Sequence, residues 1–288
     1  MSKARKRRLS TNKPFIFVII ITLIMMFAYF LSAQAFIGMG IAIPVVMITE
    51  GSFDQQKILD LSSLFSIFGG FIVLIFYYFW YRPEYKWKRN KNEAWKFTVP
   101  ILIYWVLFFG VSYAIAAGHC TLGVPTLSAA LPMIAAGICE EVAFREVGIS
   151  YMRRQLKGEN KILLTLIFTG VTFGFTHLSN AFKGDFLESL IQSALASMLG
   201  IFFGAIFIRT GNIWPCILTH GLHDLLFAIA SVHYDVEEEP LFLFVVAMIC
   251  ESLLMVWGLY LVRKEKHPEI EALWSEKWQI PAEPSAAE

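Results

Sequence analysis

Charged residues are scarce in this sequence, and their scarcity argues against a soluble globular domain. Only 16% of the 288 residues are Asp, Glu, Lys or Arg, whereas 57% are hydrophobic. Soluble domains carry about 25% charged and 45–50% apolar residues, so the composition indicates a polytopic membrane protein. The net charge of +1 gives no indication of nucleic-acid binding, and no nucleic acid is expected as a partner.

Paired cysteines and metal-binding motifs are also missing. The four cysteines show no C-x-x-C spacing, so neither a zinc ribbon nor a disulfide framework is expected, and we interpret them as small packing residues. The chain has no H-E-x-x-H sequence, so no motif demands a metal. No internal repeat, low-complexity block or second domain is visible in the sequence.

Long apolar runs, by contrast, follow one another and predict an all-α bundle of about eight transmembrane helices. The first run extends from residue 14 to about residue 48, longer than the roughly 20 residues that one span needs. We interpret it as one retained helix, although its basic start and the sequence Ala33-Gln34-Ala35 also resemble a signal peptide with its cleavage site. The further spans are expected at roughly 59–79, 98–117, 125–152, 162–178, 187–208, 213–232 and 240–262.

Lysine and arginine are distributed unequally between the connecting segments. If the N-terminus is cytoplasmic, 21 of the 24 Lys and Arg residues fall on the cytoplasmic side, as the positive-inside rule requires. We therefore expect an integral multi-pass protein with cytoplasmic N- and C-termini, and the short loops favour a bacterial cell membrane. The expected parts are a basic tail (1–13), a transmembrane helical domain (14–264) and a loosely ordered C-terminal tail (265–288).

Two adjacent glutamates and an arginine interrupt the apolar span at 125–152. An ionisable side chain at the centre of a membrane costs at least about 2.5–3.5 kcal/mol. The presence of Glu140, Glu141 and Arg145 in this span therefore requires a structural or functional explanation. Glu141 and Arg145 are one helical turn apart with the acid first, which favours an ion pair between them. Glu140 lies about 100° around the helix from Glu141 and is left without that partner. One glutamate is therefore expected to be structural, and the other to be available for chemistry.

Two later spans carry further polar groups at helical spacing. Phe173 and His177 are one turn apart in one span, and His220 and Asp224 are one turn apart in another, with His223 between them. A carboxylate one turn from a histidine can orient its ring. Taken singly, these groups could be interfacial histidines, packing aromatics or interhelical ion pairs. Because they concentrate in three spans, we expect one buried polar site where three helices meet.

The ordered set of these residues resembles a known family. It is similar to the three motifs of the CAAX-protease and bacteriocin-processing (CPBP/Abi) intramembrane endopeptidases, relatives of the Ras-converting CAAX protease. The resemblance covers about residues 125–232. The third motif commonly ends in Asn in that family, whereas this chain has Asp. The matching runs are Glu140-Glu141-x-x-x-Arg145, Phe173-x-x-x-His177 and His220-x-x-x-Asp224.

The resemblance implies hydrolysis of a peptide bond within the membrane. A buried glutamate would act with a histidine as general base on water, and burial among apolar residues disfavours its charged form, which improves it as a base. An ionised Asp224 cannot donate a hydrogen bond to an oxyanion, so we expect that it either orients His220 or is protonated. The implied roles are general base for Glu140 with His177, oxyanion stabilisation for His220 and Asp224, and structural or orienting roles for Glu141, Arg145 and Phe173.

The implied substrate is a hydrophobic or lipidated peptide or a small membrane protein. Prenylated CAAX tails, bacteriocin-type peptides and peptide pheromone precursors all fit this description. The alternatives are a non-catalytic immunity or scaffold protein and a proton-coupled transporter whose relay uses the same groups. The lack of an internal repeat disfavours the transporter. The sequence does not specify the oligomeric state.

The sequence leaves the presence of a metal open. Glu140, His177 and His220 could ligate zinc, because two histidines and one carboxylate do so in known sites. A metal-free, glutamate-dependent site is the other interpretation. Counted at about 1.5 Å per residue, Glu140 and His220 fall in the cytoplasmic half of the membrane, whereas His177 falls near the outer end of its span. The sequence does not show how this gap closes.

Overall fold

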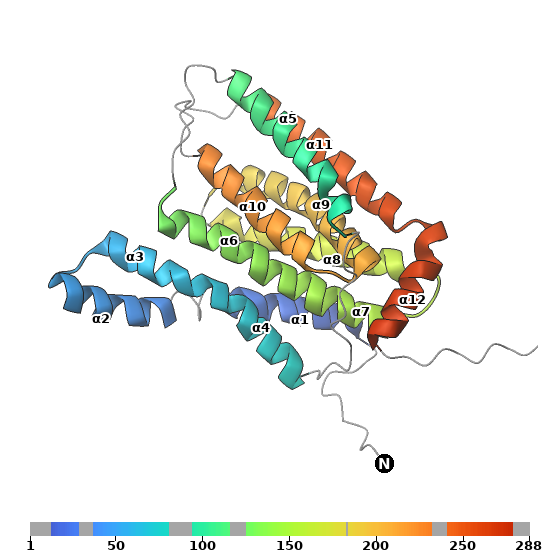
Figure 1. Cartoon of the computed structure of the whole chain (residues 1–288), viewed down its shortest axis with the longest axis horizontal. Coiled ribbons are helices and arrows are strands. Elements are labelled where there is room, and N and C mark those ends of the chain that lie inside the picture. The colour runs from blue at the N-terminus through green and yellow to red at the C-terminus, as the bar shows by residue number, and fades with distance from the viewer. Residues whose placement is uncertain are drawn as a thin grey trace, which may run out of the picture.

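The computed structural model describes residues 13–28, 37–80, 94–115, 125–182, 184–231 and 241–278. Every regular element within these ranges is a helix (Figure 1), which confirms the predicted all-α class. The basic tail before Lys13, the Ala33-Gln34-Ala35 sequence and Cys120 lie outside the described residues. Six stretches of this part of the chain are long and apolar enough to cross a membrane: Gln55–Phe79, Ala94–Val111, Leu127–Gln155, Lys161–Phe182, Phe186–Thr210 and Phe244–Leu261.

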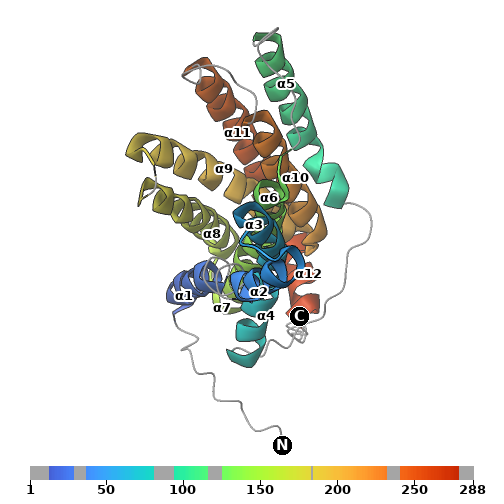
Figure 2. The same cartoon turned by 90° about the vertical axis from the view of Figure 1, so that its left-hand side faces the viewer.

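The helices pack into one elongated bundle. In Figure 1, α6 and α10 lie nearer the viewer, and α8 and α9 lie behind them; Figure 2 shows the same two pairs from the side. In chain order the α-helices are α1 (Pro14–Met26), α2 (Met39–Glu50), α3 (Gln55–Ser63), α4 (Phe68–Trp80), α5 (Val99–Ile115), α6 (Leu127–Glu141), α7 (Ser150–Gln155), α8 (Lys161–His177), α9 (Phe186–Thr210), α10 (Trp214–Ser231), α11 (Leu241–Leu261) and α12 (His267–Trp278).

The first apolar run, for which the sequence predicted a single helix, is described in two parts on either side of residues 29–36. It contains two helices, α1 and α2, which lie one after the other along the long axis of the bundle (Figure 1). The chain then reverses, because Gly51 ends α2 in the left-handed conformation (φ 68°) and Asp54 begins α3 by accepting a hydrogen bond from the Lys57 amide. Glycine takes this conformation without the steric cost of a Cβ atom.

Glycines let the central helices approach at the level of their backbones. A Cβ atom at Gly137 of α6 would lie 2.5 Å from the backbone nitrogen of Gly221 on α10. A Cβ atom at Gly170 of α8 would lie 3.3 Å from the carbonyl carbon of Gly200 on α9. Gly200 and Gly204 form the G-x-x-x-G sequence of the sixth predicted span, and both face α8. Their small size therefore serves packing within the chain.

The helix that carries the glutamates changes its winding directly after them. Residues Val142–Ile149 form a π-helical segment between α6 and α7, and every residue of it is buried. A π-helical segment is rare and is frequently found at functional sites. Pro132 lies within α6, but the change of winding follows the glutamates rather than preceding them. The sequence did not predict the π-helical segment.

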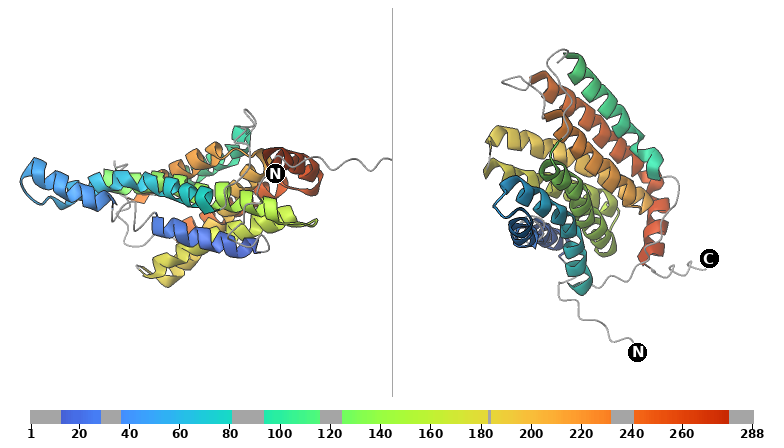
Figure 3. Two further views of the ribbon diagram at one scale, coloured as in Figure 1. Left: turned by 90° about the horizontal axis from the view of Figure 1, so that it is seen from below. Right: turned by 60° about the vertical axis from the view of Figure 1, so that its left-hand side comes forward.

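The C-terminal segment is ordered where a loose tail was expected. In α12, the Trp274 indole is buried, and its Nε1 donates to the carbonyl of Ile208 at 2.9 Å. Lys277 Nζ donates to the carbonyl of Gly211, just after α9, at 2.9 Å. Figure 3 shows α12 turning away from α11 to lie across one end of the bundle. The expected tail is therefore a docked helix as far as residue 278.

Candidate active site

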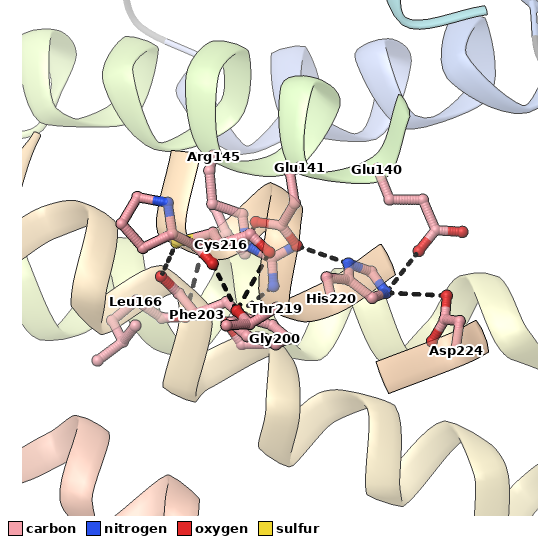
Figure 4. A network of polar contacts seen from close by, with 12 residues as sticks. Glu140, Glu141, Arg145, Leu166, Gly200, Phe203, Cys216, Thr219, His220 and Asp224 are labelled. Carbon is pink, nitrogen blue, oxygen red and sulfur yellow. Dashed lines mark hydrogen bonds and ion pairs between the residues drawn. The ribbon is translucent and has the colours of Figure 1, made fainter. Parts of the chain in front are cut away.

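Glu141, Arg145 and His220 form the buried centre of the site (Figure 4). Glu141 ends α6, and its Oε2 lies 3.1 Å from Nε of Arg145 in the π-helical segment. The other oxygen, Oε1, lies 2.8 Å from Nδ1 of His220 on α10. Arg145 Nη2 also donates to the carbonyl of Gly200 on α9 at 3.3 Å. Glu141 thus connects an arginine of its own helical run to a histidine of another helix.

The second ring nitrogen of His220 faces two further carboxylates. Nε2 lies 3.4 Å from Oδ2 of Asp224 and 3.8 Å from Oε2 of Glu140. Glu141 is paired with Arg145 as a carboxylate, so it accepts from Nδ1–H of His220. His220 can then donate from Nε2 only as an imidazolium. Glu140, Glu141 and Asp224 are the counter-charges that surround this form.

Two phenylalanines hold the His220 imidazole in place. Phe203 of α9 stacks on the ring, with centroids 5.4 Å apart and 20° between the planes. Phe173 of α8 meets it edge to face, at 5.7 Å and 81°. The guanidinium carbon of Arg145 lies 4.6 Å from the Phe173 centroid, a cation–π distance. Phe173 therefore contacts both the arginine and the histidine of the central pair.

His177 is held by the last turn of α8. Its Nδ1 lies 3.3 Å from the carbonyl oxygen of Phe173 and 3.3 Å from Oγ1 of Thr176, and its ring centroid is 5.2 Å from that of Phe173. A carbonyl only accepts, so this contact is a hydrogen bond in the Nδ1–H tautomer, which leaves a lone pair on Nε2. The rings of His177 and His220 therefore both contact the ring of Phe173. No hydrogen bond joins His177 to Glu140 within the described residues.

Three features of the site were not predicted from the sequence. The sequence assigned Glu141 to Arg145 alone, whereas the structure adds its contact with His220. Phe203 carries no sequence signal, since it is one of 26 phenylalanines. A second buried cluster includes Glu251 of α11. That residue could have been found as a lone carboxylate within an apolar run, because such residues are functional candidates by default.

The described side chains do not form a ligand set for a metal. The three ligands considered from the sequence were Glu140, His177 and His220. No group of three or more His, Cys, Asp or Glu side chains in the described part of the chain is arranged to hold an ion. His220 Nδ1 is committed to Glu141, and His177 Nδ1 faces its own backbone. As placed, these groups interact with one another and with the protein.

One comparison with known proteins gives a family match that covers the site. Residues 122–226 match the family model described as Type II CAAX prenyl endopeptidase Rce1-like. The matched segment contains all three motifs and the α6, α8 and α9 helices. No curated protein and no solved structure gives a match. The family match supports a CAAX-type intramembrane endopeptidase as the general class of this protein.

Proposed function

We propose that this chain, which matches the Rce1-like CAAX endopeptidase family model over residues 122–226, hydrolyses a peptide bond of a hydrophobic or lipidated peptide within the membrane. The observation that supports this proposal is the difference in accessibility among three neighbouring carboxylates. The side chains of Glu140 and Asp224 are 17% and 23% exposed, whereas that of Glu141 is fully buried. We infer that water and substrate approach Glu140 and Asp224 rather than the carboxylate that holds Arg145.

The partly exposed groups suit the first step of hydrolysis. Glu140 would take a proton from a water molecule as the water oxygen bonds to the carbonyl carbon of the substrate. The carbonyl oxygen becomes an oxyanion, to which the imidazolium of His220 can donate from Nε2. When the C–N bond breaks, the proton held by Glu140 passes to the leaving amine. The products are a carboxylic acid and an amine, and Glu140 returns to its starting state.

The remaining residues would orient these groups. The lone pair on Nε2 of His177 can accept a hydrogen bond from the attacking water. Glu141 accepts from Nδ1 of His220 at 2.8 Å and would thereby hold the ring for donation from Nε2. Asp224, at 3.4 Å from the same Nε2, would act as a counter-charge to the imidazolium. Glu141 is thus the closer orienting carboxylate, whereas the sequence left Asp224 either to orient His220 or to be protonated.

The proposal also specifies the substrate and the orientation of the chain in the membrane. We favour a short lipidated or apolar peptide, because the site lies among apolar helices and a prenylated peptide is what the family name describes. The cytoplasmic placement of both termini rests on the distribution of Lys and Arg, of which 21 of 24 fall on one side. The choice of a bacterial cell membrane rests on the short loops.

The decisive experiment compares membrane peptides and small membrane proteins from cells that carry matched amounts of four forms of the protein. These are the wild type, Glu140→Gln, His177→Ala and a control, Glu159→Gln, which makes the same chemical change in an exposed turn. We expect one precursor to accumulate in the first two variants and its shortened product to disappear. The control should match the wild type, and the mass of the product identifies the cleaved bond.

The two alternative functions predict different results. A scaffold or immunity protein would keep its cellular phenotype in Glu140→Gln, and no peptide would change. A proton-coupled transporter would lose proton flux in reconstituted vesicles without any change in peptide masses. An unchanged peptide profile in folded Glu140→Gln and His177→Ala variants would overturn the peptidase proposal.

A further inference from the structure

A second polar cluster lies beside the site, on another edge of α10. The indole nitrogen of Trp105 on α5 donates to Nδ1 of His223 at 3.0 Å, and the two rings stack with centroids 6.3 Å apart. Both side chains are buried. Phe227, one turn further along α10, packs on the His223 ring at 4.8 Å. This cluster attaches α5 to α10 through one directional hydrogen bond.

The same cluster ties α5 to the rest of the bundle. The Tyr104 hydroxyl donates to Oε1 of Glu251 on α11 at 3.3 Å, and Glu251 is buried. A Cβ atom at Gly258 of α11 would lie 3.1 Å from the Cα of Phe202 on α9, so α11 itself packs closely against the central helices. The helix that places Trp105 against α10 is α5, and α5 is therefore itself fixed to α11 by the Tyr104–Glu251 hydrogen bond.

The position of His223 around the axis of α10 determines what the Trp105–His223 hydrogen bond can do. Successive residues of an α-helix are about 100° apart, so His223 lies about 60° from His220 on one side. Gly221 lies about 100° from His220 on the other side, where it contacts Gly137 of α6. Asp224 lies between His220 and Gly221. The two contacts thus hold α10 on both sides of the residues that face Glu140.

We propose that the Trp105–His223 hydrogen bond is a positioning contact that sets the rotation of α10 about its axis and so aims His220 and Asp224 at Glu140. A smooth glycine contact allows a helix to roll, whereas a directional hydrogen bond on the other side opposes rolling. Side-chain ends lie about 5–6 Å from a helix axis, so a roll of about 10° moves them by about 1 Å. Trp105 lies outside the family-matched segment, and the effect on hydrolysis rests on the proposed function.

The test uses two matched tryptophan variants and two variants of His223. Trp105→Phe removes the indole donor and keeps an aromatic ring. Trp257→Phe, the control, makes the same change on α11 at an indole nitrogen that has no hydrogen-bond partner in the described part of the chain. His223→Asn keeps an acceptor near the Nδ1 position, whereas His223→Leu removes it. Far-UV circular dichroism and thermal melting confirm that each purified variant is folded.

The first measurement is independent of catalysis. In protein labelled with ¹⁵N at its six histidines, the Nδ1–H proton of His220 reports its hydrogen bond to Glu141. Trp105→Phe and His223→Leu should shift this signal, His223→Asn should shift it less, and Trp257→Phe should leave it in place. An unshifted His220 signal in a folded Trp105→Phe protein would overturn the proposal.

The second measurement uses a fluorescent prenylated CAAX peptide as the probe. A misplacement of about 1 Å can cost up to about 100-fold in rate, and we expect kcat of Trp105→Phe to fall about tenfold with KM within about twofold. His223→Asn should recover part of the rate that His223→Leu loses. If the wild type does not cleave this peptide, prenylated CAAX peptides are refuted as its substrate, and the spectroscopic result decides the positioning role. An unchanged kcat in Trp105→Phe, with an active wild type, would refute that role.

Discussion

At the scale of single residues, Glu140 and Glu141 show how neighbours in the sequence can differ in role. Glu141 is enclosed, with one oxygen in an ion pair with Arg145 and the other hydrogen-bonded to His220. Glu140 is partly exposed and lies 3.8 Å from His220 without an arginine partner. A buried ion pair adds little net stability, but removing one partner leaves an uncompensated charge in an apolar interior. Glu141 is therefore expected to matter for folding, and Glu140 for chemistry.

Glu141→Gln should destabilise the protein by about 3–5 kcal/mol, because Arg145 then lacks its buried counter-charge. Glu140→Gln should cost about 1 kcal/mol or less. The free energy of unfolding in mixed detergent and SDS micelles measures both. The double variant Glu141→Gln/Arg145→Met should cost less than the sum of its two single changes, since no charge remains unpaired. Equal costs for Glu140→Gln and Glu141→Gln would contradict this division of roles.

At the scale of elements, the α6–α10 crossing brings the first and third motifs together. Gly137 lies one turn before Glu141, and Gly221 directly follows His220. Their backbones meet without intervening side chains, so the Glu141–His220 hydrogen bond spans two helices at close range. The α8–α9 contact at Gly170 and Gly200 supports the same site from the other side, where Phe173 and Phe203 enclose the His220 ring.

Gly137→Ala should abolish activity and lower stability. Its new Cβ would meet backbone atoms of Gly221 at 2.5 and 2.7 Å, and backbone cannot move aside as a flexible side chain can. The helices must separate, which breaks the hydrogen bond between Glu141 and His220. The matched control is Gly110→Ala on α5, where nothing lies within 4 Å of the added atom. Alanine there should be neutral or stabilising by about 0.5–1 kcal/mol, as thermal melting of both variants would show.

At the scale of the whole molecule, α12 joins the ends of several helices. Glu271 of α12 pairs with Arg153 of α7 and, at 2.8 Å, with Lys161 of α8. Glu269 pairs with Arg209 of α9 and, at 2.8 Å, with Lys266. Burial acts to raise the pKa of Glu271, but the hydrogen bond from Lys161 and the charge of Arg153 outweigh it and hold that pKa below its usual range. Hydrogen bonds from Lys266 and Arg209 likewise lower the pKa of Glu269.

These two lowered pKa values predict that α12 detaches in acid. A carboxyl whose pKa is lower in the folded state stabilises that state above its unfolded pKa of about 4.3, and this contribution is lost as pH falls through the folded value. Fluorescence of the buried Trp274 should therefore stay constant from neutral pH to about pH 5 and shift to longer wavelength below about pH 4. Glu271→Gln should weaken docking at neutral pH, where the Glu271 side chain is charged, and should reduce the pH dependence. A signal that stays flat to pH 3 would contradict this account.

Local features of this protein could be predicted from the sequence by itself. The apolar runs indicated the all-α membrane class, because burial in lipid requires backbone hydrogen bonds to close within each helix. The period of 3.6 residues predicted that Glu141 faces Arg145, that Phe173 faces His177 and that His220 faces Asp224, since these pairs lie within one turn. The ordered motifs also indicated the family, which agrees with the match over residues 122–226.

Only the tertiary structure decided which helices meet and at which residues. Glu141 and His220 are 79 positions apart, and their contact depends on how two glycine surfaces fit, a property of three-dimensional packing rather than of periodicity. The docking of α12 and the link from Trp105 to His223 have the same origin. Each is stabilised by contacts between distant segments, whereas hydropathy and spacing describe one helix at a time.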